Sequence, residues 1–392
     1  MDVALFWDER LLAYRFHPEH PFNPRRWEVT VDLLRAANLV RPEEIHSSVV
    51  ADDEVLTLVH TRGYVEAVRA LSDEAVSPWE GGRWGLGTED NPIFPGMHEA
   101  AARIVGTTCR AAAWVMEQPH RRAFAIAGGL HHAHRDRASG FCIYNDVAVA
   151  IAWLRRAYDA RVLYLDIDAH HGDGVQAIFY DSPHVLTVST HETGRFLFPG
   201  SGFVDELGEG QGYGFSWNLP VEPFSDDDAW APPVLELLEG AFDFFRPDVV
   251  VLQAGCDGHA FDPLTHLYAS TSFYEAVVQR VVALADAICD GRLLVTGGGG
   301  YAIWQVVPRV WGLVWGILAE RAVPDAVPEV WRTRWQTEAP LRLPERWRDN
   351  PAELPRLPPA ARTEIAARNR RALETLRRVL APLRERGPTS IR

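Results

Sequence analysis

The segment VLYLDIDAHHGDG, residues 162–174, places three acids and two adjacent histidines directly after an apolar run. In an extended chain alternate side chains share a face, so Asp166, Asp168 and His170 are expected to begin on the same side. Carboxylates crowded at the end of a buried strand are costly unless a cation or hydrogen-bond donors compensate them. Because a carboxylate and an imidazole in this arrangement can share a metal ion, the segment predicts a positively charged partner.

A further acid, Asp257, follows the apolar run 249–255. With Asp168 and His170 it would supply two carboxylates and one imidazole, leaving positions open for water and substrate, as a catalytic Zn²⁺ site requires. Two anionic ligands would also neutralise a divalent ion. Each residue alone could instead cap a helix or form a turn. Their combination at the ends of predicted strands favours the metal site.

His131 and His132 follow another apolar run, 124–129. Paired histidines in a pocket can act as general bases near neutral pH. Asp166 and Asp173 remain available to orient them, since a carboxylate fixes the tautomer of an imidazole and raises its basicity. The spacing leaves open which histidine pairs with which acid.

Four glycines, 297–300, precede Tyr301. A nucleotide-binding glycine loop is disfavoured because no second strand with a ribose-binding acid follows about 20 residues later and the chain has no lysine for a P-loop. We interpret the glycines as allowing close backbone approach and presenting the Tyr301 hydroxyl to a developing oxyanion. An ordinary buried tyrosine is the alternative.

The elements that must position these residues form a repeated strand-then-helix pattern. Helical patterns such as 100–117 and 274–288 alternate with apolar runs, which predicts an α/β fold with an open, mainly parallel β-sheet and helices on both faces. Such sheets bind ligands beyond the carboxyl ends of their strands. The predicted strands are residues 3–7, 124–129, 162–168, 185–190, 249–255 and 293–300.

Composition indicates an ordinary globular protein of 392 residues, 47% hydrophobic and 23% charged. The first residues carry no basic segment before an apolar stretch, and no apolar run approaches the length of a membrane span, so a cytoplasmic location without membrane association is expected. The four cysteines lack CxxC spacing, which argues against a zinc ribbon, a redox motif or a disulfide framework. The net charge of −14 should repel nucleic acid; it suits a cationic partner such as a lysine-rich segment, or solubility alone.

Two regions are predicted: a catalytic domain over residues 1–325, and a Pro- and Arg-rich arm over residues 326–392 that ends in a helix at about 360–386. The apolar stripe of that helix, which includes Leu373, Leu376 and Leu380, needs cover. Packing back on the body and forming a homo-oligomer with a second subunit are equally compatible with the pattern.

Five long motifs resemble the zinc-dependent histone deacetylase family, which has the arginase/deacetylase fold. They are GGLHHAHRDRASGFCIYND, DIDAHHGDGVQAIFY, VSTHETGRFLFPGSG, AGCDGHAFDPL and GGGGY, and the resemblance runs from about Val3 to Trp315. The segment GCDGHAFDPLTHL is similar to that of bacterial acetoin-utilisation (AcuC-type) deacetylases. The resemblance implies removal of acetyl groups from acetyl-lysine side chains of proteins, with release of acetate.

The resemblance also implies a role for each site residue. It assigns Zn²⁺ (or Fe²⁺) binding to Asp168, His170 and Asp257, general base and acid chemistry to His132 with Asp173, a supporting pair to His131 with Asp166, and oxyanion donation to Tyr301. It assigns substrate contacts to Asp90, which would grip the substrate backbone, to Gly140, Phe141 and Phe198, which would line the acyl-lysine tunnel, and to Arg26, which would line the acetate exit. It places one structural K⁺ at the carbonyls of Asp166, Asp168 and His170 with Ser189 and Thr190, and a second K⁺ at Phe179, Ser182, Val185 and Phe215.

Three alternatives are weighed. Polyamine deacetylases carry an acidic gatekeeper near the tunnel mouth, where this chain has Leu264, so small acylated amines are the second choice of substrate. Arginases hold two Mn²⁺ with a D-A-H-x-D pattern, but Gly172 occupies the position of its last acid, which favours one metal. A metal-free binding scaffold would have a broken motif, and none of the expected groups is missing.

Overall fold

The computed structural model describes residues 1–73 and 78–384. Within these residues the strands form one eight-stranded sheet in the order β2-β1-β3-β8-β7-β4-β5-β6, and every neighbouring pair is parallel. The predicted α/β fold with a parallel sheet is confirmed. The strands are β1 (Asp2–Phe6), β2 (Ile45–His46), β3 (Arg121–Ala125), β4 (Val162–Asp166), β5 (Val185–Glu192), β6 (Ser216–Val221), β7 (Val249–Gln253) and β8 (Leu293–Thr296).

Two edge strands, β2 and β6, are absent from the sequence prediction. β2 has only two residues, and β6 reads SWNLPV, where polar residues and Pro220 interrupt the apolar pattern. An edge strand tolerates proline because one side of its backbone needs no ladder partner. Four predicted strands also extend too far, since β3, β4, β7 and β8 end before the glycines and acids that follow them.

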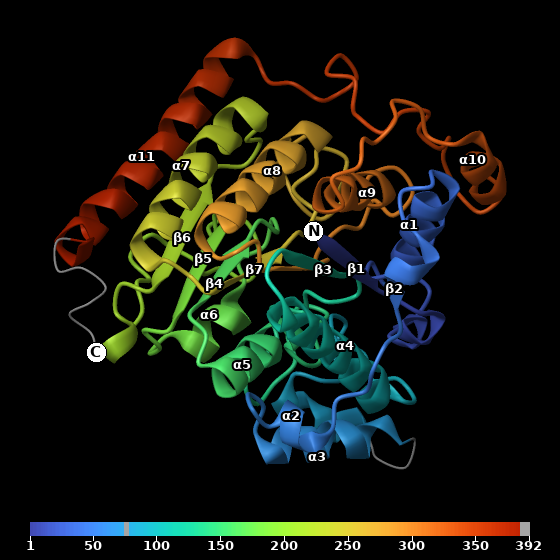
Figure 1. Ribbon diagram of the computed structural model, residues 1–392, viewed down its shortest axis with the longest axis vertical. Coiled ribbons are helices and arrows are strands. Elements are labelled where there is room, and N and C mark those ends of the chain that lie inside the picture. The colour runs from blue at the N-terminus through green and yellow to red at the C-terminus, as the bar shows by residue number, and fades with distance from the viewer. Residues whose placement is uncertain (74–77, 385–392) are drawn as a thin grey trace.

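Helices cover both faces of the sheet (Figure 1). One layer contains α1, α7, α8 and α9, and the other contains α2 to α6. The near-continuous apolar strands predicted this cover, because both of their faces are buried. The helices are α1 (Arg25–Ala36), α2 (Asp53–Leu56), α3 (Arg62–Ser72), α4 (Met97–Glu117), α5 (Asp146–Tyr158), α6 (Asp173–Phe179), α7 (Asp227–Phe245), α8 (Thr271–Ile288), α9 (Val307–Leu318), α10 (Glu329–Trp335) and α11 (Pro359–Arg384).

The strand order places a switch point between β4 and β7. From β4 the chain proceeds to β5 on one side, whereas from β7 it proceeds to β8 on the other side. The register pairs Asp166, the last residue of β4, with Gln253, the last residue of β7. The segments that follow these two strands therefore leave the sheet side by side, which is where open α/β sheets bind ligands.

The described part of the C-terminal arm packs on the body of the same chain. Trp331, Trp335 and Trp347 are buried in the common core. Helix α11 lies along α7 and the edge strand β6 (Figure 1), with Leu373, Leu376 and Leu380 buried, so its apolar stripe is covered within the chain. A homo-oligomer through the arm stays a prediction. The predicted end of the helix, residues 385–386, lies outside the described residues.

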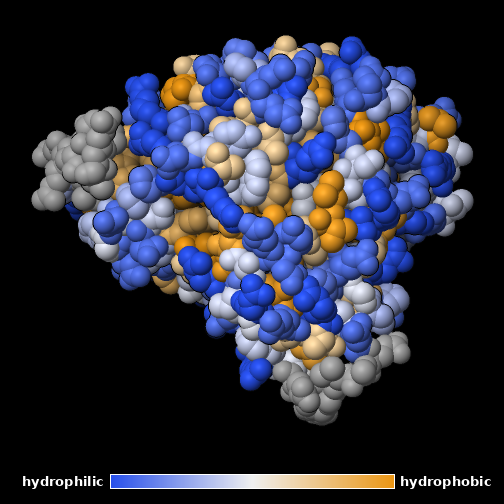
Figure 2. Space-filling model, turned by 60° about the horizontal axis from the view of Figure 1, so that its bottom comes forward, coloured by the Kyte–Doolittle hydropathy of each residue, from blue (hydrophilic) through white to orange (hydrophobic). Residues whose placement is uncertain are grey.

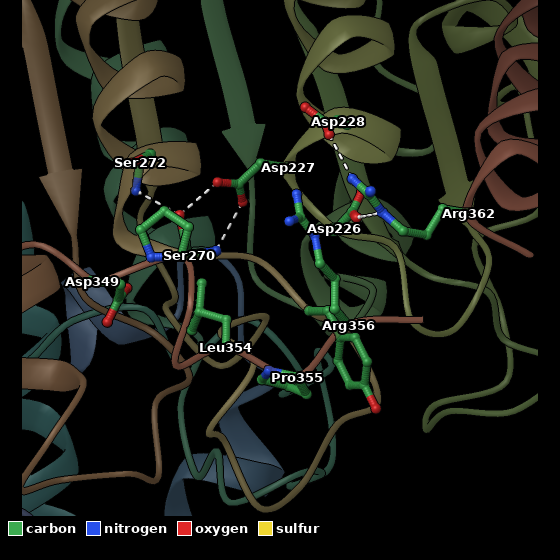
Figure 3. A pocket seen from close by; sticks show the side chains of 12 residues that line it. Asp226, Asp227, Asp228, Ser270, Ser272, Asp349, Leu354, Pro355, Arg356 and Arg362 are labelled. Atoms are coloured by element: carbon green, nitrogen blue, oxygen red, sulfur yellow. Dashed lines mark hydrogen bonds and ion pairs between the residues drawn. The ribbon is translucent and has the colours of Figure 1, made fainter. Parts of the chain in front are cut away.

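Ion pairs at the start of α11 support this packing. The Arg362 guanidinium donates to the carboxylates of Asp226 and Asp228 at the start of α7, beside a pocket that Arg356 and Asp349 of the arm also line (Figure 3). Every aspartate drawn there already accepts a hydrogen bond from another residue of the chain. We therefore interpret the pocket as the junction between the C-terminal arm and the body of the protein.

The surface is consistent with a charged globular chain. On the face shown in Figure 2, apolar residues form small groups separated by hydrophilic ones. None of the helices in the described ranges combines the length and apolar character needed to cross a bilayer.

Candidate active site

The predicted metal ligands Asp168, His170 and Asp257 converge beyond β4 and β7. All three side chains are buried, and one potential ligand atom from each lies within 4.8 Å of the others. Nδ1 of His170 is 2.8 Å from Oδ2 of Asp257 and 3.3 Å from Oδ1 of Asp168. The fold therefore brings two carboxylates and one imidazole together, although His170 and Asp257 are 87 residues apart in the sequence.

The loop after β4 is held by its own acids. Strand β4 ends at Asp166, so the alternation argument does not extend to Asp168 and His170, and this part of the expectation is corrected. Instead the backbone N–H of Asp168 donates to Asp166 Oδ1, and that of His170 donates to Asp168 Oδ1, both at 3.0 Å. Such contacts from an aspartate to the backbone two residues on are typical of tight turns. The carboxylates thus shape the loop that presents them.

The electrostatics of these three residues fit a divalent cation. Burial, followed by repulsion from Asp168, raises the pKa of Asp257 to about 6. Burial lowers the pKa of His170, but the two carboxylates outweigh it and raise that pKa well above its usual value. Two buried acids, of which Asp257 is destabilised as a carboxylate by burial and by Asp168, lie next to a nitrogen donor and form a donor set that a divalent metal would neutralise.

Gly299 is required beside this group. A Cβ atom at Gly299 would lie 2.1 Å from Asp257 Oδ2, and the Gly299 N–H donates to Asp168 Oδ2 at 2.6 Å. The glycine run after β8 therefore lets the backbone touch both carboxylates, as the sequence analysis proposed for close approach.

His131 pairs with Asp166 and His132 pairs with Asp173. Nδ1 of His131 donates to Asp166 at 2.8 Å, and Nδ1 of His132 donates to Asp173 at 2.7 Å. The pairing that the residue spacing left open, and that the family resemblance implied, is present in the structure. His134 adds a second contact to Asp173 at 3.2 Å.

The two histidines differ in protonation. Burial lowers the pKa of His131, but Asp166 and Asp168 outweigh it and raise the pKa to about 9. Burial, and then the positive charge of His131, lower the pKa of His132 to about 4. Burial raises the pKa of Asp173, but hydrogen bonds from His132 and His134 hold it well below its usual value. At neutral pH a cationic His131 therefore lies beside a neutral His132.

Tyr301 follows β8 on the same side of the sheet. Its backbone N–H donates to the buried Asp262 at 2.7 Å, and its ring contacts Phe141 edge to face at 5.8 Å. Arg26, buried in α1, donates to the Gly300 carbonyl at 2.9 Å and lies 5.8 Å from the Tyr301 ring. The hydroxyl of Tyr301 has no hydrogen-bond partner among the described residues, so it is available to an incoming group.

Two of the predicted tunnel residues, Gly140 and Phe198, lie beside His132. The Phe198 ring lies 5.0 Å from the His132 ring and 6.5 Å from that of His170, and Phe198 is 43% exposed, so it reaches from the buried site to the surface. A Cβ atom at Gly140 would lie 2.5 Å from Cδ2 of His132 and 2.9 Å from the Phe198 ring. Gly140 and Phe198 therefore form adjoining walls next to the imidazole.

Asp90 and Leu264 occupy the periphery of the site. The carbonyl of Asp90 contacts His20 Nε2 at 3.3 Å, and the His20 ring lies 4.7 Å from Phe141. The backbone of Leu264 donates to Asp262, the acid that also holds the Tyr301 backbone. The structure thus places both residues one side chain away from the predicted site residues.

Sequence reasoning missed several supporting side chains. Tyr164 donates to Asp166 at 2.6 Å. This contact could have been predicted, because residues two apart on a strand share a face. Asp262 accepts from the Tyr301 N–H, and the Tyr14 hydroxyl donates to the Phe141 carbonyl at 2.6 Å. Neither contact could be predicted from the sequence, because the two partners are distant along the chain. Asn145, the cap of α5, donates to the His131 and Ala133 carbonyls and so fixes the histidine loop.

The residues predicted for K⁺ lie where β4 meets β5. The register pairs Asp166 with Ser189, and the Ser189 hydroxyl is 2.8 Å from His191 Nδ1. At the second predicted position, the Ser182 N–H donates to the Phe179 carbonyl. Potassium binding at both positions stays a prediction.

Comparison with known proteins agrees with this geometry. The family model described as "Histone deacetylase domain" matches residues 20–318. The chain is 45% identical over 373 residues to the acetoin utilization protein AcuC of Bacillus subtilis, covering 94% of this chain and 95% of that protein. It is 43% identical over 321 residues to the AcuC protein of Staphylococcus aureus strain MRSA252, covering 82% of each.

Solved structures show the same architecture. A crystal structure of an HDAC homolog complexed with SAHA superposes with a TM-score of 0.83 at 29% identity, covering 94% of this chain and all of that one. The HDAC homolog from Aquifex aeolicus gives a TM-score of 0.81 at 27% identity, with the same coverage.

Proposed function

The chain belongs to the histone deacetylase family, and on this premise we propose that it is a zinc-dependent hydrolase that removes acetyl groups from acetyl-lysine side chains of proteins. The family and the acetoin utilization relatives indicate a hydrolase that acts on amide bonds. The observation that carries the proposal is the convergence of the Asp168, His170 and Asp257 ligand atoms beside two carboxylate-bound histidines.

The protein side of the reaction follows from the protonation of the histidines. A bound Zn²⁺ would polarise the acetyl carbonyl and lower the pKa of the attacking water. Neutral His132, whose Nδ1 proton is held by Asp173, accepts the water proton at Nε2 and later passes it to the departing lysine amine. Cationic His131 keeps positive charge next to the oxygen atoms that become negative.

Tyr301 would donate its hydroxyl to the same developing oxyanion. Burial, followed by the charges of Asp257 and Asp168, raises the pKa of Tyr301 well above its usual value, so its proton is retained for donation. We place the aliphatic stem of an acylated lysine along Phe198 and Gly140, which adjoin His132. Arg26 would stabilise acetate on the far side through its buried guanidinium.

The ion preference and the second substrate class are part of the proposal. Zn²⁺ suits an imidazole with two carboxylates, and Fe²⁺ is the alternative. Small acylated amines are the second substrate candidate. Leu264 argues against this candidate, because its uncharged side chain cannot pair with the positive charge of a polyamine. A Leu264→Glu variant should gain activity on acetylpolyamines relative to a Leu264→Gln control.

A substrate panel tests the function. The zinc-loaded protein is assayed for acetate release from an acetyl-lysine peptide and from acetylpolyamines, and for urea release from arginine, with a hydroxamate as a competitor. We expect the highest kcat/KM on the peptide and inhibition by the hydroxamate. A higher kcat/KM on acetylpolyamines, or urea release, would overturn the proposal.

A further inference from the structure

A groove of about 380 Å³ lies between helix α11 and the segment that follows β5. Thr193 and Arg195 line it from that segment, Glu222 lines it from the end of β6, and Arg368 and Arg371 line it from α11. The groove thus joins the C-terminal arm to the loop that carries Phe198.

The charged lining of the groove is predominantly basic. Arg368 pairs with the groove carboxylate of Glu222 at 3.5 Å and with Glu364 at 2.6 Å. Arg195 and Arg371 are exposed, and neither guanidinium has an ion pair or side-chain hydrogen bond within residues 1–73 and 78–384. Three guanidinium groups therefore face one carboxylate, in a protein whose net charge is −14.

The groove is held close to the site entrance. Arg195 precedes Phe198 by three residues, which limits their Cα separation to about 10 Å. The Thr193 N–H donates to the Val221 carbonyl at 2.8 Å, and the N–H groups of Phe196 and Leu197 donate back to the Thr193 carbonyl. These bonds anchor the loop, so the distance between Arg195 and Phe198 is set by backbone structure.

From these observations we infer that the groove binds carboxylate side chains of the polypeptide substrate that lie a few residues from its acetyl-lysine. The inference rests on the proposed function, which places the acetyl-lysine beside Phe198. A guanidinium pairs with a carboxylate through two parallel hydrogen bonds, and Arg195 and Arg371 have that capacity free. Because the acid and the acetyl-lysine belong to one chain, binding of one raises the local concentration of the other.

Paired peptides and charge-reversal variants test the inference. One peptide carries Glu at three to six residues on either side of acetyl-lysine, and its twin carries Gln at those positions. Arg195→Glu and Arg371→Glu are compared with Arg378→Glu, which changes an exposed arginine on the same helix, two turns or about 10 Å beyond Arg371 and outside the groove. Thermal unfolding is recorded for each variant.

For the wild type we expect a KM about 10-fold lower for the Glu peptide than for the Gln peptide, with equal kcat, as two partly exposed ion pairs would give. The two groove variants should lose this difference and keep their activity on the Gln peptide, whereas Arg378→Glu should keep both. The preference should also shrink as salt is added. Equal KM values for the wild type, or loss of the preference in Arg378→Glu, would overturn the inference.

A binding assay separates this inference from the proposed function. If no acetyl-lysine peptide is cleaved, the proposed function fails, and the groove is then judged by fluorescence anisotropy with a labelled Glu peptide. Binding to the wild type that Arg371→Glu removes would support the groove, and equal binding would refute it. Tighter binding of a single-stranded oligonucleotide at the same arginines would also refute it, because the groove would then be a general polyanion site.

Discussion

The Nε2 atoms of His131 and His132 lie 3.0 Å apart, and each ring is bound to a different carboxylate through Nδ1. Protons on both facing nitrogens would repel each other strongly at this distance, so in the resting site one ring is neutral. The carboxylates decide which one, since Asp166 and Asp168 keep the proton on His131. His132 is thereby left neutral, as its proposed role of general base requires.

This coupling predicts a shift in the pH dependence of Asp166→Asn. Removing the carboxylate lowers the pKa of His131, so the positive charge of His131 lowers the pKa of His132 less. The pKa of His132 then rises from about 4, so the acidic limb of the kcat/KM profile should move to higher pH. Tyr164→Phe, which keeps the Asp166 charge, is the control and should leave the limb close to its wild-type position. An unmoved limb in Asp166→Asn would refute the coupling.

Tyr301→Phe would remove the proposed hydroxyl donor to the oxyanion. We expect turnover to fall roughly 10²- to 10³-fold with fold and metal content unchanged, the usual effect of losing one such donor. Steady-state kinetics with circular dichroism and metal analysis measure these quantities. A variant with full activity would exclude Tyr301 from the mechanism.

Gly299→Ala should impair metal binding. The added Cβ would meet Asp257 Oδ2 at 2.1 Å and must displace that carboxylate from His170. A Zn²⁺ titration should show at least 10-fold weaker binding, the scale on which mispositioned ligand shells act. In Gly82→Ala, a control where the new Cβ meets nothing within 4 Å, zinc affinity should match the wild type. Unchanged affinity in Gly299→Ala would show that the carboxylate does not bind the ion.

Much of the fold and part of the site could be predicted from the sequence. Apolar runs such as that of β4 mark buried parallel strands, and parallel strands bring their carboxyl ends to one edge, so Asp168 and Asp257 could be expected to meet. The partner of each histidine could not be predicted from spacing, because the His132–Asp173 contact depends on how α6 turns back after the β4 loop. Edge strand β6 was missed for a similar reason: its stability comes from β5 and α11 rather than from its own pattern.

The stability of the C-terminal arm is expected to depend on Asp349. This carboxylate accepts from His259 and from the Thr271 N–H, both at 2.8 Å, and pairs with Arg309 at 2.9 Å. Burial raises its pKa, but His259 and Arg309 outweigh burial and hold it well below its usual value. Removing one partner from such a buried group typically costs about 3–5 kcal/mol, so Asp349→Asn should lower the unfolding free energy by that order.

The sign of the pH dependence follows from the lowered pKa of Asp349. The carboxylate's contribution is complete above its unfolded pKa of about 4 and is lost as pH falls through the folded value. Denaturant unfolding should therefore show a difference between wild type and Asp349→Asn that is largest at pH 6 and shrinks towards pH 2. The fully exposed Asp325→Asn should show no difference. A difference that grows on acidification would contradict this account.

The central claim is that Asp168, His170 and Asp257 would hold one divalent ion and that the protein loaded with this ion hydrolyses an acetyl-lysine amide. The most direct measurement is a titration of the metal-stripped protein with Zn²⁺, following acetate release from an acetyl-lysine peptide. The account predicts activity that rises in proportion to added zinc and stops at one ion per chain, and that is absent from Asp257→Ala at the same zinc content. Activity that requires two ions per chain, or a fully loaded protein that releases no acetate, would contradict it.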